Sequence, residues 1–165
     1  MENAAKILKY IHLGEGIEKK GINFYSNAYK RVIDPNSKAL LKFLIGEEKI
    51  HLNYFLQLER KVRKGKTDGK MRRLKNPIFN KAAYKRIKGN KATLFNIFNA
   101  ALEIETKSIR LYSSIGKKVK DKKLKRLMGA LVAFETNHYR LIKMHKDTLY
   151  NFLYWTGRKQ ARLET

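Results

Sequence analysis

Two short segments of the chain carry a glutamate and a histidine at a spacing that suits metal binding. Glu48 precedes His51 by three residues, and Glu135 precedes His138 by the same interval. On a helix, residues three apart lie on adjacent turns of one face, so both side chains can reach the same site. Carboxylates together with imidazoles suit iron or manganese, and zinc is a common substitute. With two further glutamates, the candidate metal ligands are Glu18, Glu48, His51, Glu105, Glu135 and His138.

An internal duplication relates these six residues. Shifting the chain by 87 residues aligns residues 18–51 with 105–138 without a gap, and 13 of the 34 positions are identical. Self-similarity of this kind indicates two copies of one structural unit. The shift places Glu18 on Glu105, Glu48 on Glu135 and His51 on His138. We therefore expect two equivalent helical hairpins whose candidate ligands meet about a pseudo-twofold axis.

Each copy has the pattern of two amphipathic helices joined by a short link. Residues 94–119 place mainly apolar side chains at a 4-3-4-3 spacing, which puts them on one helical face, and residues 7–32 repeat the spacing. Asp34 and Pro35 predict a helix start, because Asp can cap the free amides of a first turn and Pro is tolerated at the first helical position. Asp121 holds the equivalent place. Links this short make consecutive helices antiparallel neighbours.

A long basic segment separates the two copies. Residues 60–91 contain 14 Lys or Arg and a single acid, and four glycines or prolines interrupt any long helix there. The sequence therefore predicts one all-α domain over residues 1–165, an antiparallel four-helix bundle with one long crossover. We expect hairpins at residues 4–64 and 93–155, a crossover at 65–92 with a short helix around 79–87, and a frayed tail at 156–165.

The candidate glutamates interrupt apolar helical faces, and this position needs an explanation. An ionised carboxylate in a bundle interior loses several kcal/mol of hydration unless it is paired or bound to metal. Four such carboxylates at one level repel each other unless cations lie among them, and two divalent ions supply the matching charge. Tyr25 and Tyr112 lie two turns beyond Glu18 and Glu105. They are either simple core aromatics or hydrogen-bond donors to the ligand carboxylates.

At these residues the sequence resembles the rubrerythrin branch of the ferritin-like superfamily. The segment from Glu18 to Tyr25 is similar to that family's first-helix motif, and Glu135-Thr-Asn-His138 is similar to its fourth-helix motif. The resemblance covers residues 4–150 apart from the basic crossover. It implies a ferritin-like domain and a bridged centre of two Fe ions that reacts with hydrogen peroxide or dioxygen. It also implies an external electron donor, rubredoxin-like or other, and a homodimer.

One position departs from the family pattern. Rubrerythrins carry an additional carboxylate three residues after the third-helix ligand, and this chain has Ser108 there, while Glu103 lies off the ligand face. The plain six-ligand site resembles ferroxidase or oxidase centres at least as closely. The chain has no cysteine, which excludes disulfides, cysteine-ligated zinc, iron–sulfur clusters and a rubredoxin-like iron centre within it. The electron donor is therefore expected to be a separate protein.

The charge of the chain leaves a second function open. Its 38 Lys plus Arg against 14 Asp plus Glu give a net charge of +24, which suits a nucleic-acid partner, although a lysine-rich surface is more often a solvated face. A DNA-protecting ferritin-like protein, an iron-storing cage and a purely structural metal site are the alternatives to an oxidoreductase. No signal peptide or membrane span is apparent, so we expect a cytoplasmic protein without a membrane partner. The candidate nucleic-acid surface comprises Arg60, Lys61, Arg63, Lys64, Lys70, Arg72, Arg73, Lys85 and Arg86.

Overall fold

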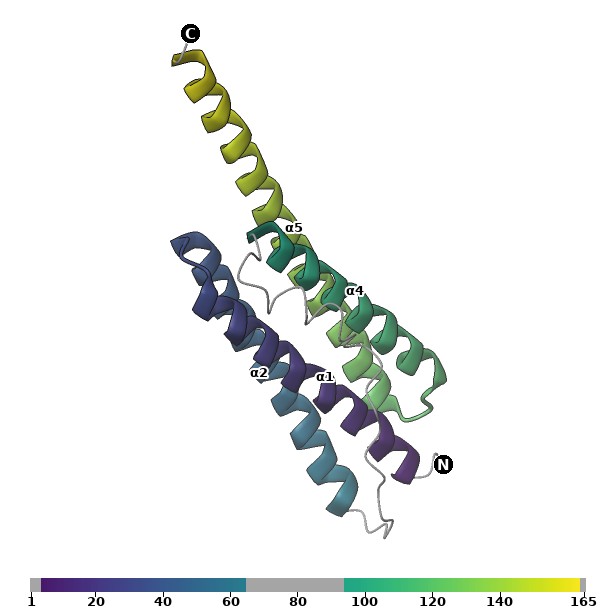
Figure 1. The fold of residues 1–165 in the computed structure, drawn as a ribbon. Coiled ribbons are helices and arrows are strands. Elements are labelled where there is room, and N and C mark those ends of the chain that lie inside the picture. The colour runs from purple at the N-terminus through teal and green to yellow at the C-terminus, as the bar shows by residue number, and fades with distance from the viewer. Residues whose placement is uncertain (1–3, 65–93, 164–165) are drawn as a thin grey trace.

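Four long helices form the part of the chain that the computed structural model describes, residues 4–64 and 94–163 (Figure 1). Of residues 153–163 only the backbone is described. The sequence prediction of an all-α bundle is confirmed. The helices are α1 (Ala4–Arg31), α2 (Pro35–Lys64), α4 (Leu94–Lys118) and α5 (Lys122–Leu163).

Two short links make α1 with α2, and α4 with α5, into antiparallel hairpins. Each link ends on the aspartate that the sequence marks as a helix start. Oδ2 of Asp34 accepts a hydrogen bond from the backbone N–H of Ser37 at 2.7 Å. Oδ1 of Asp121 accepts the equivalent bond from Leu124 at 2.8 Å. Both aspartates satisfy a free amide of the first helical turn, so the two predicted helix starts are confirmed.

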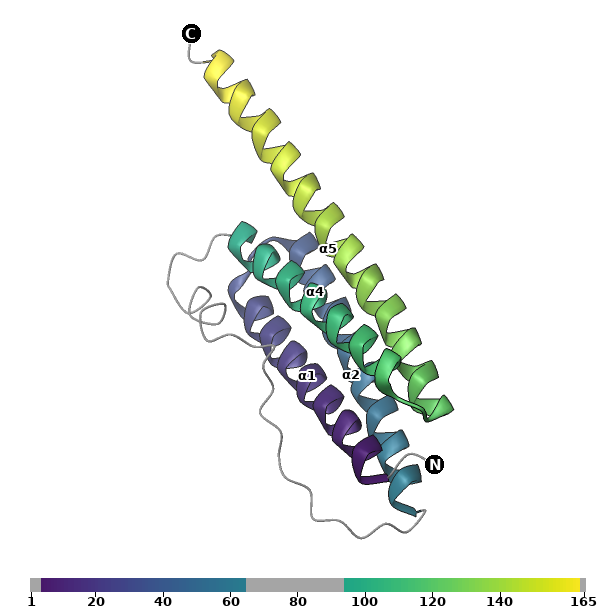
Figure 2. The same cartoon turned by 90° about the vertical axis from the view of Figure 1, so that its right-hand side faces the viewer.

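The two hairpins pack face to face, with α1 against α4 and α2 against α5. Figure 2 shows that α2 ends at one end of the bundle and that α4 begins at the other. This direction of α4 is the one that a long crossover permits, and it is the connectivity of ferritin-like bundles. The crossover itself, with the predicted helix at residues 79–87, lies outside the described residues.

The core consists of two apolar layers with the candidate ligands between them. One layer contains Tyr25, Leu44 and Phe98, and the other contains Phe55 and Tyr112. On each of the four helices, the chain passes from one layer to the other at the glutamate of the predicted site. The carboxylates are therefore enclosed by apolar side chains on both sides along the bundle axis.

The end of α5 differs from the sequence prediction. The sequence predicts a hairpin that ends at residue 155 and a frayed tail at 156–165, but α5 continues to Leu163 and projects beyond the other helices (Figures 1 and 2). The reason lies in helix propensity, because residues 158–163 are all strong helix formers and Gly157 alone does not end the helix. Among the described residues, none of the helices combines the length and the apolar character that crossing a membrane requires.

Candidate metal centre

The structure brings all six predicted ligands together in the middle of the bundle. Each helix contributes at least one of them, and none of the six exposes more than 4% of its surface. The glutamates of α1 and α4 enter from one side, and the Glu-x-x-His pairs of α2 and α5 enter from the other. The residues are Glu18 on α1, Glu48 and His51 on α2, Glu105 on α4, and Glu135 and His138 on α5.

The six residues divide into two overlapping groups of four. In each group, one ligand atom from every residue lies within 4.8 Å of the others. Glu48 and Glu135 belong to both groups, so each of these two carboxylates could serve both metal positions. The first group is Glu18, Glu48, His51 and Glu135, and the second is Glu48, Glu105, Glu135 and His138.

The two shared carboxylates each direct one oxygen to each imidazole. Glu135 places Oε1 at 3.3 Å from Nδ1 of His51 and Oε2 at 3.3 Å from Nδ1 of His138. Glu48 places Oε2 at 3.6 Å from Nδ1 of His51 and Oε1 at 3.8 Å from Nδ1 of His138. Two donors that each lie about 2.1 Å from one ion are at most about 4.2 Å apart. These separations therefore fit a metal ion beside each histidine.

Several buried atoms of the centre have no hydrogen-bond partner. They include Oε2 of Glu18, Oε2 of Glu105, and Nδ1 of both histidines. Leaving a buried polar atom unsatisfied costs about 1–3 kcal/mol, and more for a charged group. Metal ions held by these atoms would remove that penalty. The residues present therefore fit two metal ions.

Two tyrosines hold the unshared glutamates across the hairpin boundary. The hydroxyl of Tyr25 on α1 donates to Oε1 of Glu105 on α4, and the hydroxyl of Tyr112 on α4 donates to Oε1 of Glu18 on α1. Both tyrosines are fully buried. Of the two interpretations of these residues, the structure supports contact with the ligand carboxylates. Each bond leaves Oε2 of the glutamate free to face the centre.

Burial and mutual repulsion perturb the titration of the metal-free centre. Burial, followed by the charge of Glu135, raises the pKa of Glu48 well above its usual range, and the same two causes raise the pKa of Glu105. Burial acts to raise the pKa of Glu135 as well, but its contacts with Glu105 and both histidines hold it below the usual range. Burial acts to lower the pKa of His51, but the carboxylates of Glu135 and Glu18 raise it to about 9. Metal binding must therefore displace protons from this centre.

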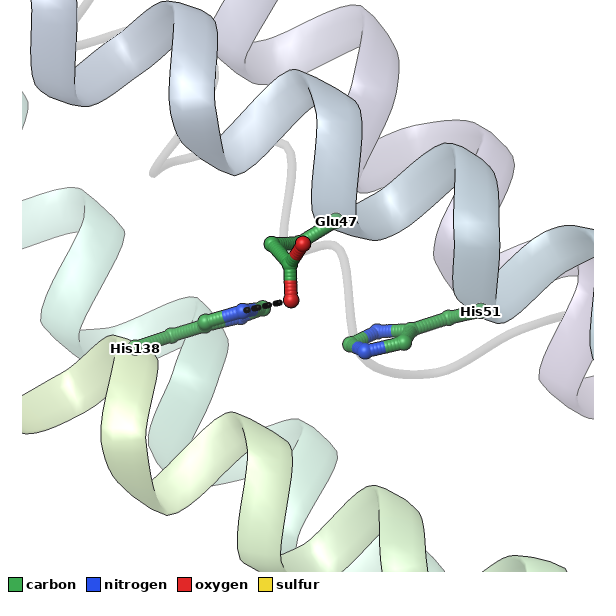
Figure 3. A group of neighbouring side chains, drawn as sticks. All are labelled: Glu47, His51 and His138. Carbon is green, nitrogen blue, oxygen red and sulfur yellow. Dashed lines mark ion pairs between the residues drawn. The ribbon is translucent and has the colours of Figure 1, made fainter.

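The sequence analysis missed Glu47, which lies at the outer edge of the centre. Its Oε2 is 3.9 Å from Nε2 of His138, and its side chain is 28% exposed. Figure 3 shows the Glu47 carboxylate directed towards the space between the rings of His51 and His138. In the duplication, Glu47 corresponds to Phe134, whose ring stacks on His51 at 5.1 Å between centroids. The two halves of the centre are therefore unequal, and this inequality was readable from the repeat alignment.

The remaining predicted residues lie away from the centre. Exposed basic side chains cover the end of α2, and one of them, Arg63, pairs with Glu59 at 2.6 Å. His145, another histidine of α5, bonds to Ser37 at 2.8 Å and lies outside the candidate metal groups. Of the candidate nucleic-acid surface, the structure describes Arg60, Lys61, Arg63 and Lys64, whereas Lys70, Arg72, Arg73, Lys85 and Arg86 lie outside the described residues.

The fold and the centre define a ferritin-like helical bundle with a carboxylate and histidine site. The sequence profile of the rubrerythrin family matches residues 16–146, which include all six predicted ligands. The chain belongs to the rubrerythrin family, a ferritin-like di-iron family.

Two solved structures resemble the fold. "CopM in the Cu(I)-bound form" has a TM-score of 0.66 at 10% sequence identity, covering 91% of this chain and 99% of that chain. "CopM in the Ag-bound form" has a TM-score of 0.63 at 10% identity, covering 86% of this chain and 96% of that chain. At such low identity the likeness shows the helical fold alone. The sequence has no significant match among curated proteins.

Proposed function

We propose that this protein is a di-iron oxidoreductase that reduces hydrogen peroxide or dioxygen. One observation carries the proposal: two groups of four ligands share Glu48 and Glu135, and each group has its own histidine. When bound, two ferrous ions would supply the electrons that reduce the oxygen–oxygen bond. Manganese or zinc could occupy the same ligands.

The residues of the chain have separate tasks in this proposal. Glu48 and Glu135 would contribute ligands to both metal ions, while Glu18 and Glu105 would each contribute to one. Tyr25 and Tyr112 orient the two unshared glutamates through their hydrogen bonds. The apolar layers on both sides exclude water and strengthen the electrostatic interactions inside the centre.

Electrons must reach the centre from another protein, because the chain has no cysteine to hold an iron–sulfur or rubredoxin-like site. A separate electron-transfer protein, rubredoxin-like or other, is therefore part of the proposal. Reduction of one peroxide to two waters consumes two electrons and two protons, so a single loaded centre could complete one turnover before the donor is needed.

Elemental analysis after anaerobic ferrous reconstitution tests the site. The centre should account for two irons per chain, so Glu48→Ala should hold two fewer irons than the native protein, because Glu48 belongs to both ligand groups. Glu103→Ala is the matched control, since Glu103 is on the surface and pairs with Lys107. A Glu48→Ala protein that holds as many irons as the native protein would contradict the ligand assignment.

Reaction of the loaded protein with one equivalent of oxidant tests the activity. We expect anaerobic addition of hydrogen peroxide, or of dioxygen, to oxidise both irons within one turnover and to give the absorption of a ferric centre. If neither oxidant oxidises the bound iron faster than it oxidises free ferrous ion, the result would contradict the proposed activity and indicate a structural metal site. Accumulation of an iron mineral core, together with elution as a large assembly in size-exclusion chromatography, would favour a storage cage over a homodimer.

The charge of the chain supports a second candidate function, association with nucleic acid. The net charge is +24, and Arg60, Lys61 and Lys64 are exposed at the end of α2. Non-specific phosphate contacts weaken by about 10³–10⁵ between 50 and 200 mM salt when 6–10 contacts form. Duplex DNA binding that persists at about 200 mM salt would favour a DNA-protecting role, and its loss below that concentration would indicate a solvated surface.

A further inference from the structure

A second cluster of metal-binding side chains lies on the first hairpin, away from the di-metal centre. His12 and Glu15 are three residues apart on α1, and Glu59 faces them from α2. One ligand atom from each residue lies within 4.8 Å of the other two. Nε2 of His12 is 2.7 Å from Oε1 of Glu59. The cluster therefore joins the two helices of the hairpin through one imidazole and two carboxylates.

The cluster contains a buried oxygen without a partner. Oε1 of Glu15 is buried and has no hydrogen bond, and the Glu15 side chain is only 10% exposed. Its other oxygen has one distant partner, Nζ of Lys19 at 3.4 Å, on a side chain that is 56% exposed. Burial, followed by the charge of Glu59, raises the pKa of Glu15. Two carboxylates thus lie close together here, and the more buried one lacks a strong positive partner.

The duplication supplies an internal comparison for this position. A shift of 87 residues carries His12 to Asn99, Glu15 to Leu102 and Glu59 to Lys146. In the second hairpin, Nζ of Lys146 donates to Oδ1 of Asn99 at 2.9 Å. The second hairpin therefore has a positive side chain of its own where the first has Glu59. In the first hairpin the same helix pair presents three groups that can all ligate a cation.

We propose that His12, Glu15 and Glu59 form a separate site for one divalent transition-metal ion. One imidazole and two carboxylates suit Fe²⁺, Mn²⁺ or Zn²⁺. Glu59 lies eight residues after His51, which is about 12 Å along the helix axis, so the two sites share no ligand. Arg63 also contacts Oε1 of Glu59 at 2.6 Å, but its side chain is 54% exposed and can turn into solvent when an ion binds.

Counting bound Zn²⁺ in matched variants tests this proposal. After incubation with excess Zn²⁺ and removal of the free ion, we expect three ions per chain in the native protein. His12→Ala with Glu15→Gln should hold two, and Glu48→Ala should hold one. Asn99→Ala, the equivalent change in the second hairpin, should keep three. A native protein that holds two ions, or a His12→Ala, Glu15→Gln protein that holds three, would overturn the proposal.

NMR spectroscopy locates the bound ion directly and complements the count of bound Zn²⁺ ions. In the Glu48→Ala background, substoichiometric Mn²⁺ should broaden the imidazole NMR signals of His12 before those of His145. His145 is a suitable reference because it bonds to Ser37 and lies outside the cluster. Equal broadening of both signals would show non-specific binding and would contradict the site. This arm remains informative if the di-iron proposal fails, because it uses a protein without that centre.

Discussion

The hydroxyl of Tyr25 on α1 donates a hydrogen bond to Glu105 on α4, so a ligand of the second hairpin is oriented by a side chain of the first. Tyr112 and Glu18 form the reciprocal bond. At the same level, Glu135 contacts His51 and Glu48 contacts His138, so α2 and α5 are linked as well. The crossed pair therefore couples assembly of the bundle to the geometry of the metal centre.

Replacing Tyr25 with Phe should weaken the centre without removing it. Oε1 of Glu105 would lose its donor while remaining buried, which costs about 1–3 kcal/mol of folding stability. Loss of a group that orients a ligand lowers metal affinity by about 10–100-fold. Metal titration and urea unfolding measure the two effects. Tyr29→Phe, on the exposed side of α1, is the control and should change neither. Unchanged affinity in Tyr25→Phe would show that the bond does not position Glu105.

Replacing Glu47 with Ala should make the two metal positions more unequal. When Nδ1 of His138 binds a metal, its Nε2 carries a proton, and Glu47 is the nearby acceptor. The ion beside His138 should therefore bind about 10-fold more weakly, while the ion beside His51, which stacks on Phe134, should change little. A stepwise metal titration resolves the two affinities. Equal weakening of both ions would contradict this role of Glu47.

The metal-free protein should lose stability as the pH rises above neutrality. The pKa of His51 is about 9 in the folded chain against an ordinary value of 6.5. A raised folded-state pKa gives stability that is complete below 6.5 and is lost as the pH rises through about 9. The loss is at most about 3 kcal/mol for this one group. Urea unfolding with a chelator at several pH values measures it, and His51→Gln should flatten the dependence. Metal-loaded protein should behave oppositely, because protons compete with the metal.

Replacing Gly14 with Ala should destabilise the bundle through a steric clash. A Cβ atom at Gly14 would lie 2.1 Å from Cζ of the buried Phe55 ring. Overpacking of this kind costs about 1–3 kcal/mol, because the ring must leave its position. Gly46→Ala is the matched control, since nothing lies within 4 Å of its Cβ position and Ala favours the helix by up to about 1 kcal/mol. Thermal unfolding of the two variants should shift in opposite directions.

The sequence by itself determined the helices, the duplication and the set of six candidate ligands. These follow from local chemistry and from spacing, because the helical period fixes which side chains share a face. The helix starts at Asp34 and Asp121 were also readable, because capping acts within one turn. The end of α5 was less readable, because the strong helix formers at residues 158–163 continue the helix through the expected frayed tail.

Only the tertiary structure decided how the four helices rotate and slide against each other. That register sets which oxygens of Glu48 and Glu135 face His51 and His138. It also placed Glu47 beside His138, and His12 on α1 beside Glu59 on α2. Helical periodicity does not predict these contacts. The apolar face of a helix repeats every turn, so the same apolar residues can be buried when one helix is shifted along its neighbour. The packing of the side chains in the two core layers selects one register, and with it the geometry of both metal-binding clusters.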